Sequence, residues 1–138
     1  MAVTPLMGSI TQSMKYLAER QRVVAQNIAN SETAGFKAQD VEAPDFSALL
    51  TTRGVPHVVP PRVHVTSGMV ALGMQPDSHG KIVADSDVSE IKPNGNNVTL
   101  EDQLLKMGGI QTDFATMTNL YRKQMGLLQA AIGHGSGN

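Results

Sequence analysis

Residues 7–28, MGSITQSMKYLAERQRVVAQNI, predict one long amphipathic helix. Apolar side chains recur three or four positions apart in this stretch, which is the spacing of a coiled-coil seam. Thr4 and Pro5 fit an N-cap and a first helical position, and Asn30 fits the end of the helix. The expected seam consists of Met7, Ile10, Met14, Leu17, Val24 and Ile28.

Residues 100–132 predict a second long helix. Glu101 and Asp102 fall in its first turn, where the helix dipole favours acidic groups. Gly108 and Gly109 interrupt the pattern at a cost of about 0.8–1 kcal/mol each relative to alanine. The expected seam consists of Leu100, Leu104, Met107, Phe114, Tyr121 and Leu128, and a second apolar row consists of Leu105, Ile110, Met117, Leu120 and Leu127. Two rows predict contacts on more than one side of the helix, the alternative being one wide face packed on the middle segment.

The stretch between the two helices, residues 38–97, carries six of the seven prolines. This punctuation predicts an irregular arm, in which residues 55–65 and 81–83 are candidate edge strands. The expected organisation is a helix with a sequence signature over 1–37, the arm, and a helical segment over 98–138. The expected fold is mainly α, with the two terminal helices paired as an antiparallel, coiled-coil-like hairpin.

Composition narrows the possible functions. The chain has 138 residues, 11 Lys+Arg and 12 Asp+Glu, so its net charge of −1 argues against nucleic acid as the main partner. It contains no cysteine and no tryptophan, and only two Tyr and three Phe, so a self-sufficient core is expected to be thin. No stretch has the length and apolarity of a membrane span, and the first residues do not resemble a cleavable secretory signal.

No group of residues predicts catalysis, metal binding or a cofactor. His57, His64 and His79 are widely spaced and lack acidic companions, unlike the ligands of a zinc site. Residues 85–90 alternate oxygen-bearing side chains, but they lack the glycine and distant Glu of a calcium loop, so a solvated turn is expected. No nucleophile elbow or phosphate-binding glycine loop is present. We therefore expect a protein that is not an enzyme.

The residues that follow the first helix carry a family resemblance. Residues 27–37, NIANSETAGFK, resemble the signature of the bacterial flagellar axial proteins, the rod and hook family, with Ala34 where the family usually has proline. The matching positions are Asn27, Ala29, Asn30, Thr33, Gly35 and Phe36. Residues 94–103, NGNNVTLEDQ, resemble the entry to the last helix of the proximal rod members, through Gly95, Asn96 and Asn97.

The resemblance implies a structural subunit of the flagellar basal body. Family members are exported by the flagellar type III machinery without cleavage, and they assemble into the periplasmic rod. Their terminal helices pair and line the export channel. The implied partners are other rod subunits, the adaptor protein FliE and the membrane-embedded ring. The alternative is a soluble coiled-coil adaptor or chaperone of the export system, which would remain a small oligomer.

Overall fold

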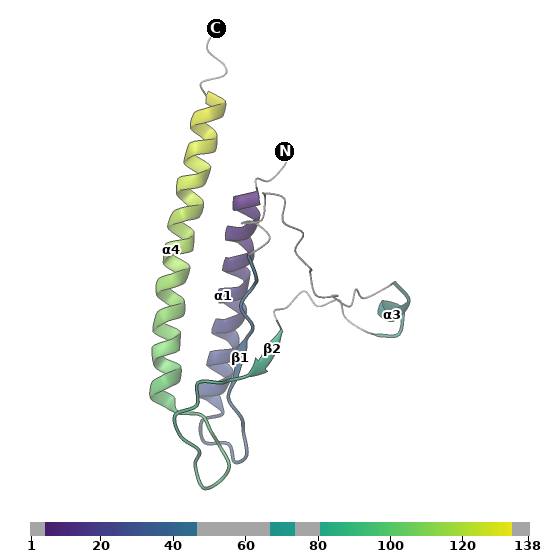
Figure 1. Cartoon of the computed structure of the whole chain (residues 1–138), viewed down its shortest axis with the longest axis vertical. Helices are drawn as coiled ribbons and strands as arrows, with labels where there is room; N and C mark the ends of the chain where they lie inside the picture. The colour runs from purple at the N-terminus through teal and green to yellow at the C-terminus, as the bar shows by residue number, and fades with distance from the viewer. Residues whose placement is uncertain (1–4, 47–66, 74–80, 134–138) are drawn as a thin grey trace, which may run out of the picture.

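Two long helices form the body of the chain in the computed structural model, which describes residues 5–46, 67–73 and 81–133. Helix α1 spans Pro5–Ala29 and helix α4 spans Leu100–Gly133. They lie side by side and run in opposite directions (Figure 1). The predicted mainly α fold and the positions of both helices are confirmed. The N-cap residue predicted for α1, Thr4, lies outside the described residues.

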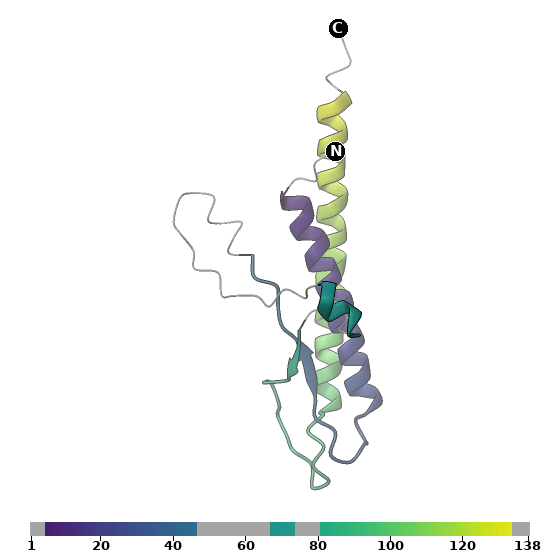
Figure 2. The same ribbon diagram turned by 90° about the vertical axis from the view of Figure 1, so that its right-hand side faces the viewer.

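A small antiparallel sheet lies between the helices in sequence. Strand β1, Gln39–Val41, pairs with strand β2, Ile82–Ala84, with Asp40 opposite Val83. Both strands lie beside the half of the pair where α1 ends and α4 begins (Figures 1 and 2). The candidate strand at residues 81–83 is confirmed within one residue, whereas that at 55–65 lies outside the described residues.

One further short helix, α3, spans Ser67–Ala71. No proline falls inside it, and Gly73 follows with a positive φ of 90°, a conformation that glycine adopts without the steric cost of a side chain. This helix lies within residues 38–97, which were predicted to form an irregular arm, and no helix was predicted at this position.

The apolar core lies along the contact between α1 and α4. Leu17, Val24 and Ile110 are buried together, and the partly buried Tyr16, Ile28, Met107 and Met117 pack against them. Four further apolar residues are buried: Val23 on α1, Ala38 just before β1, Val41 on β1 and Val98 two residues before α4. Because α1 contacts both α4 and β1, it is the central element of the fold.

Of the residues predicted for the α1 seam, Met7, Ile10, Leu17 and Val24 are buried and Met14 and Ile28 are half-buried, whereas the predicted α4 seam needs correction. Leu100 and Leu104 are 43% and 55% exposed, so they do not pack in the helix pair. Gln103 and Ile110 are buried instead. The residue that faces α1 one turn before Met107 is therefore Gln103. Its Oε1 accepts a hydrogen bond from the buried amide of Asn27, which a leucine at this position would leave unpaired.

Candidate functional site

The turn that follows α1 and the turn that precedes α4 interlock at one end of the helix pair (Figure 1). Asn96, from the second turn, is fully buried. Its Nδ2 donates hydrogen bonds to the backbone oxygens of Asn30, at 2.8 Å, and Thr33, at 2.7 Å. Its Oδ1 accepts the backbone N–H of Val98 at 2.8 Å. Both amide protons and the oxygen are therefore used, and one buried side chain joins the two turns.

Further hydrogen bonds extend the contact between these turns. The backbone N–H of Gly35 donates to the oxygen of Asn94 at 3.0 Å, and the N–H of Asn97 donates to the oxygen of Phe36 at 3.3 Å. The side-chain Oδ1 of Asn97 accepts the N–H of Ala38 at 2.6 Å. The bonds run in both directions between segments about sixty residues apart in sequence, so neither turn is held by local contacts alone.

Glycine is required in each turn by the backbone conformation. Gly35 has φ of 73° and Gly95 has φ of 83°, both in the left-handed region that L side chains rarely adopt. A Cβ placed on Gly95 would lie 3.6 Å from the Cα of Gly35, which is an ordinary contact. Strain, rather than lack of space, is therefore what a side chain at Gly95 would introduce.

Asn27 joins three elements from the last turn of α1. This buried side chain donates to the backbone oxygen of Gln39 on β1 at 2.7 Å and to Oε1 of Gln103 on α4 at 2.8 Å. Its own Oδ1 accepts the N–H of Gln39 at 3.0 Å. We call the side chains of Asn27, Asn96, Asn97 and Gln103 the amide lock. Among the described residues, no buried side-chain nitrogen or oxygen lacks a hydrogen-bond partner.

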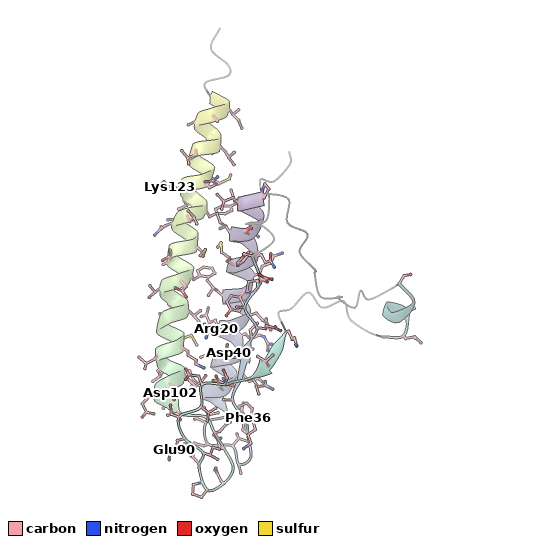
Figure 3. All side chains as sticks on the ribbon, in the orientation of Figure 1. Arg20, Phe36, Asp40, Glu90, Asp102 and Lys123 are labelled. Atoms are coloured by element: carbon pink, nitrogen blue, oxygen red, sulfur yellow. The ribbon has the colours of Figure 1, made fainter. Side chains whose placement is uncertain are left out.

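Most of the predicted signature residues meet in this lock. Asn30 closes α1 through a hydrogen bond from its Nδ2 to the oxygen of Gln26 at 2.9 Å, and its Oδ1 accepts from Thr33 Oγ1 at 3.1 Å. Phe36 is half-buried beside the second turn (Figure 3), whereas Ala29 is exposed. The residues brought together are Asn27, Asn30, Thr33, Gly35 and Phe36 with Gly95, Asn96 and Asn97.

A cluster of charges beside the lock was not predicted from the sequence. The carboxylate of Asp85 accepts from Lys106 Nζ at 2.6 and 2.7 Å and from Gln103 Nε2 at 3.3 Å. The prediction of a solvated turn is therefore wrong for Asp85, although Ser86 and Asp87 are exposed. The backbone N–H of Asp85 pairs with the oxygen of Ala38 at 3.0 Å, which turns the carboxylate toward α4.

Asp40 and Arg20 form the second half of this cluster (Figure 3). Arg20 Nε and Nη2 donate to the two carboxylate oxygens at 2.8 and 3.0 Å. Burial acts to raise the pKa of Asp40, but the Arg20 hydrogen bonds, the Val41 N–H and the charges of Arg20 and Lys106 outweigh it, so the pKa is lowered. The same hydrogen bonds raise the pKa of Arg20.

Helix α4 carries many exposed apolar side chains. Its exposed large apolar residues are Leu100, Leu104, Leu105, Phe114, Leu120, Tyr121, Met125, Leu127 and Ile132. Phe114 and Tyr121, two predicted seam residues, line a shallow hollow with Met14 and Lys15 of α1. Leu128, also predicted for the seam, is half-buried. Exposed apolar surface on this scale is typical of a site of protein association.

Helix α4 also outruns its partner. It has 34 residues against 25 in α1, or about 51 Å against about 37 Å at 1.5 Å per residue. It therefore continues past the N-terminal end of α1 (Figure 1). Leu127 and Ile132, in this last part of α4, are 57% and 62% exposed.

Comparisons with known proteins do not identify the chain: no protein family matches it, and no curated protein shows significant similarity to it. Within residues 5–46, 67–73 and 81–133, no three His, Cys, Asp or Glu side chains group as metal ligands. Within the same ranges no helix is long and apolar enough to cross a membrane. His57, His64 and His79 lie outside the described residues.

Proposed function

We propose that the chain is a structural subunit of the bacterial flagellar rod, placed at its proximal end like the rod protein FlgB. One observation carries this proposal. The two stretches that resemble the axial family, residues 27–37 and 94–103, form the two halves of one buried amide lock. Together they connect the end of α1 to the start of α4. A family signature that coincides with the joint of the helix pair supports a role in which the geometry of that pair matters.

The hydrogen bonds of the amide lock suit a subunit that must resist deformation. Buried side-chain amides that are all hydrogen-bonded favour one geometry, because a shift leaves polar groups unpaired. The apolar seam beside them is non-directional and on its own tolerates sliding. A subunit that transmits torque needs a fixed angle between its parts, and the amide lock supplies the directional contacts for it.

The surface of α4 suits assembly into an open array. An interface between unlike surfaces of identical subunits generates a filament or tube when the rotation does not close. Helix α4 offers apolar side chains along its length, and the net charge of −1 does little to keep copies apart. In the proposed rod the helix pair lines the export channel, in contact with other rod subunits, FliE and the membrane ring.

The test is recovery of the chain in purified flagellar basal bodies. An epitope-tagged chain, expressed in the organism that encodes it, should copurify with the rod and should be needed for motility. Leu105→Asp and Leu127→Asp should abolish incorporation, because they place a charge on a 75% and a 57% exposed apolar site without touching the core. Thr116→Asp, at an exposed polar position of α4, is the matched control and should be incorporated normally.

Circular dichroism of each purified variant keeps the test interpretable, since all three should retain the helical content of the parent. A tagged chain that stays entirely in the soluble fraction as a small oligomer, in cells that build complete rods, would overturn the proposal. That result would favour the export adaptor or chaperone instead.

A further inference from the structure

Four charged side chains from four segments meet between the strands and the helices. Arg20 lies on α1, Asp40 on β1, Asp85 just after β2 and Lys106 on α4. Lys106 Nζ lies 2.6 Å from the Asp85 carboxylate and 3.7 Å from that of Asp40, so it bridges both acids. The side chains of Lys106 and Asp85 are only 12% and 3% exposed. We call this group the ionic clasp; it holds two positive and two negative charges.

The clasp holds the end of β2 to α4 through charged side chains, whereas the core between the helices is apolar. Leu17, Val24 and Ile110 make an apolar contact between α1 and α4 that carries no charge. The hydrogen bonds from α4 to Asp85, the residue after β2, by contrast, all converge on its carboxylate, from Lys106 and Gln103. Losing one charge of a buried set leaves the others uncompensated, which is strongly destabilising. Loss of charge should therefore act on the strands and spare the helix seam.

We propose that the ionic clasp is a charge-controlled fastening: neutralising its two carboxylates detaches β2 from α4 and loosens β1, which keeps its uncharged hydrogen bonds to Asn27, while α1 and α4 remain joined. With both acids neutral, Arg20 and Lys106 lose their counter-charges, and a buried charge left uncompensated favours opening. The detached β2 does not stay paired with β1, because a two-stranded sheet of three residues per strand is marginal in water without packing. This inference concerns the chain itself and does not depend on the proposed rod function.

The pH direction follows from the surroundings of Asp40. The charged groups that face it are Arg20 from α1, Lys106 from α4 and, across Lys106, Asp85. Since its pKa is lowered in the folded chain, the stabilisation from Asp40 is complete above its ordinary pKa of about 3.9. The stabilisation is lost as the pH falls through the lower folded value. The Asp40 half of the clasp is therefore closed at neutral pH and weakens in acid, below that ordinary value.

Amide hydrogen exchange on the full chain tests the inference. The reporters for the strands are the N–H groups of Glu42 and Asp85, which bond to Lys81 and Ala38 across the sheet at 2.8 and 3.0 Å. In Lys106→Met and in Asp85→Asn, exchange of these amides at pH 7 should accelerate by on the order of 100-fold. The amides of α1 and α4 around the apolar seam should change by less than about threefold.

Three further measurements complete the design. Lys106→Arg keeps the charge and should restore protection of the strands. Glu42→Gln removes a carboxylate from the exposed 3.4 Å pair with Lys81 next to β1, and should have little effect. In the parent chain, lowering the pH from 7 to 3 should deprotect the strand amides first, after correction for intrinsic exchange rates.

Two outcomes would overturn the inference. In one, the strand and helix amides accelerate by the same factor, so that the clasp is part of a single cooperative unit. In the other, the strand amides keep their protection in both Lys106→Met and Asp85→Asn. The isosteric Asp85→Asn variant keeps the test valid if Lys106→Met fails to fold.

Discussion

Replacing Asn27 with alanine should remove a large part of the stability of this fold. The side chain makes three hydrogen bonds, to both backbone groups of Gln39 and to Gln103. The bond to Gln103 is buried, so its loss costs about 1–3 kcal/mol as an unsatisfied acceptor. The two partly buried bonds to Gln39 contribute about 0.5–1.5 kcal/mol each. The expected loss is about 2–6 kcal/mol, from a total of about 5–15 kcal/mol for a typical domain.

Urea denaturation followed by circular dichroism measures this loss. With a denaturant dependence of about 1–3 kcal/mol per M, the unfolding midpoint of Asn27→Ala should fall by about 0.7 M or more. Gln26→Ala is the matched control, because Gln26 is the neighbouring residue of the same helix and its side chain is exposed. Its effect should stay within about 0.5 kcal/mol.

A double-mutant cycle locates the loss. Asn27→Ala and Gln103→Ala remove partners of one 2.8 Å bond, so their effects should be non-additive by about 0.5–3 kcal/mol. If Asn27→Ala unfolds within 0.5 kcal/mol of the parent, the amide lock does not hold the pair together. Strict additivity of the two substitutions would refute the direct bond.

Three further predictions test the core, the glycines and the titration of the clasp. Ile110→Ala should lower the free energy of unfolding by about 2–5 kcal/mol, whereas Leu105→Ala, at an exposed site of the same helix, should stay within about 0.5 kcal/mol in the same urea assay. Gly95→Ala should destabilise the fold, because the φ of 83° is strained for a residue with a side chain. Gly108→Ala should stabilise the fold by about 0.8–1 kcal/mol, because its Cβ would meet open space. Melting temperatures that move in the same direction in both variants would contradict this. The stability difference between the parent and Asp40→Asn should be constant at neutral pH and shrink as the pH falls below about 4, and a difference that does not depend on pH would exclude Asp40 as the titrating group.

The helices were predictable because their signals are local. A spacing of three and four residues, proline at the start of α1 and acids in the first turn of α4 lie close together in sequence. Strand β1 has only three residues, too few for an alternating pattern to appear. The β2 region was found because β-branched residues gather at Ile82 and Val83.

The register of α4 was harder to predict than its existence. Apolar residues occupy two rows, so hydrophobic spacing permits more than one face toward α1. The structure chooses the face that carries Gln103, because Asn27 is buried opposite and needs a partner. A lone glutamine between Asp102 and Leu104 gives no local sign of this, since its partner lies 76 positions away.

Asp85 illustrates the same limit for charge. Its neighbours Ser86 and Asp87 are polar, and residues of this kind favour solvated turns. What buries it is Lys106, 21 positions away on the next helix. The ion pair with Lys106 offsets the cost of burying the Asp85 carboxylate, and the local sequence gives no sign of this pair.

Buried contacts are concentrated where α1 ends and α4 begins, and they thin out toward the far end of α4. The amide lock and the ionic clasp lie at the first end, whereas Leu127 and Ile132 lie exposed near the other. Helical turns without a packing partner are marginal in water, and Gly126 weakens them further. Leucine and isoleucine there lower the free energy only when another surface covers them. A dispersed adaptor would be better served by polar residues at these positions, because exposed apolar patches promote association. A chain with hydrogen-bonded helices at one end and an exposed apolar helix at the other suits the proposed array. In that array the amide lock would fix the angle between α1 and α4, and the exposed part of α4 would pack against neighbouring subunits.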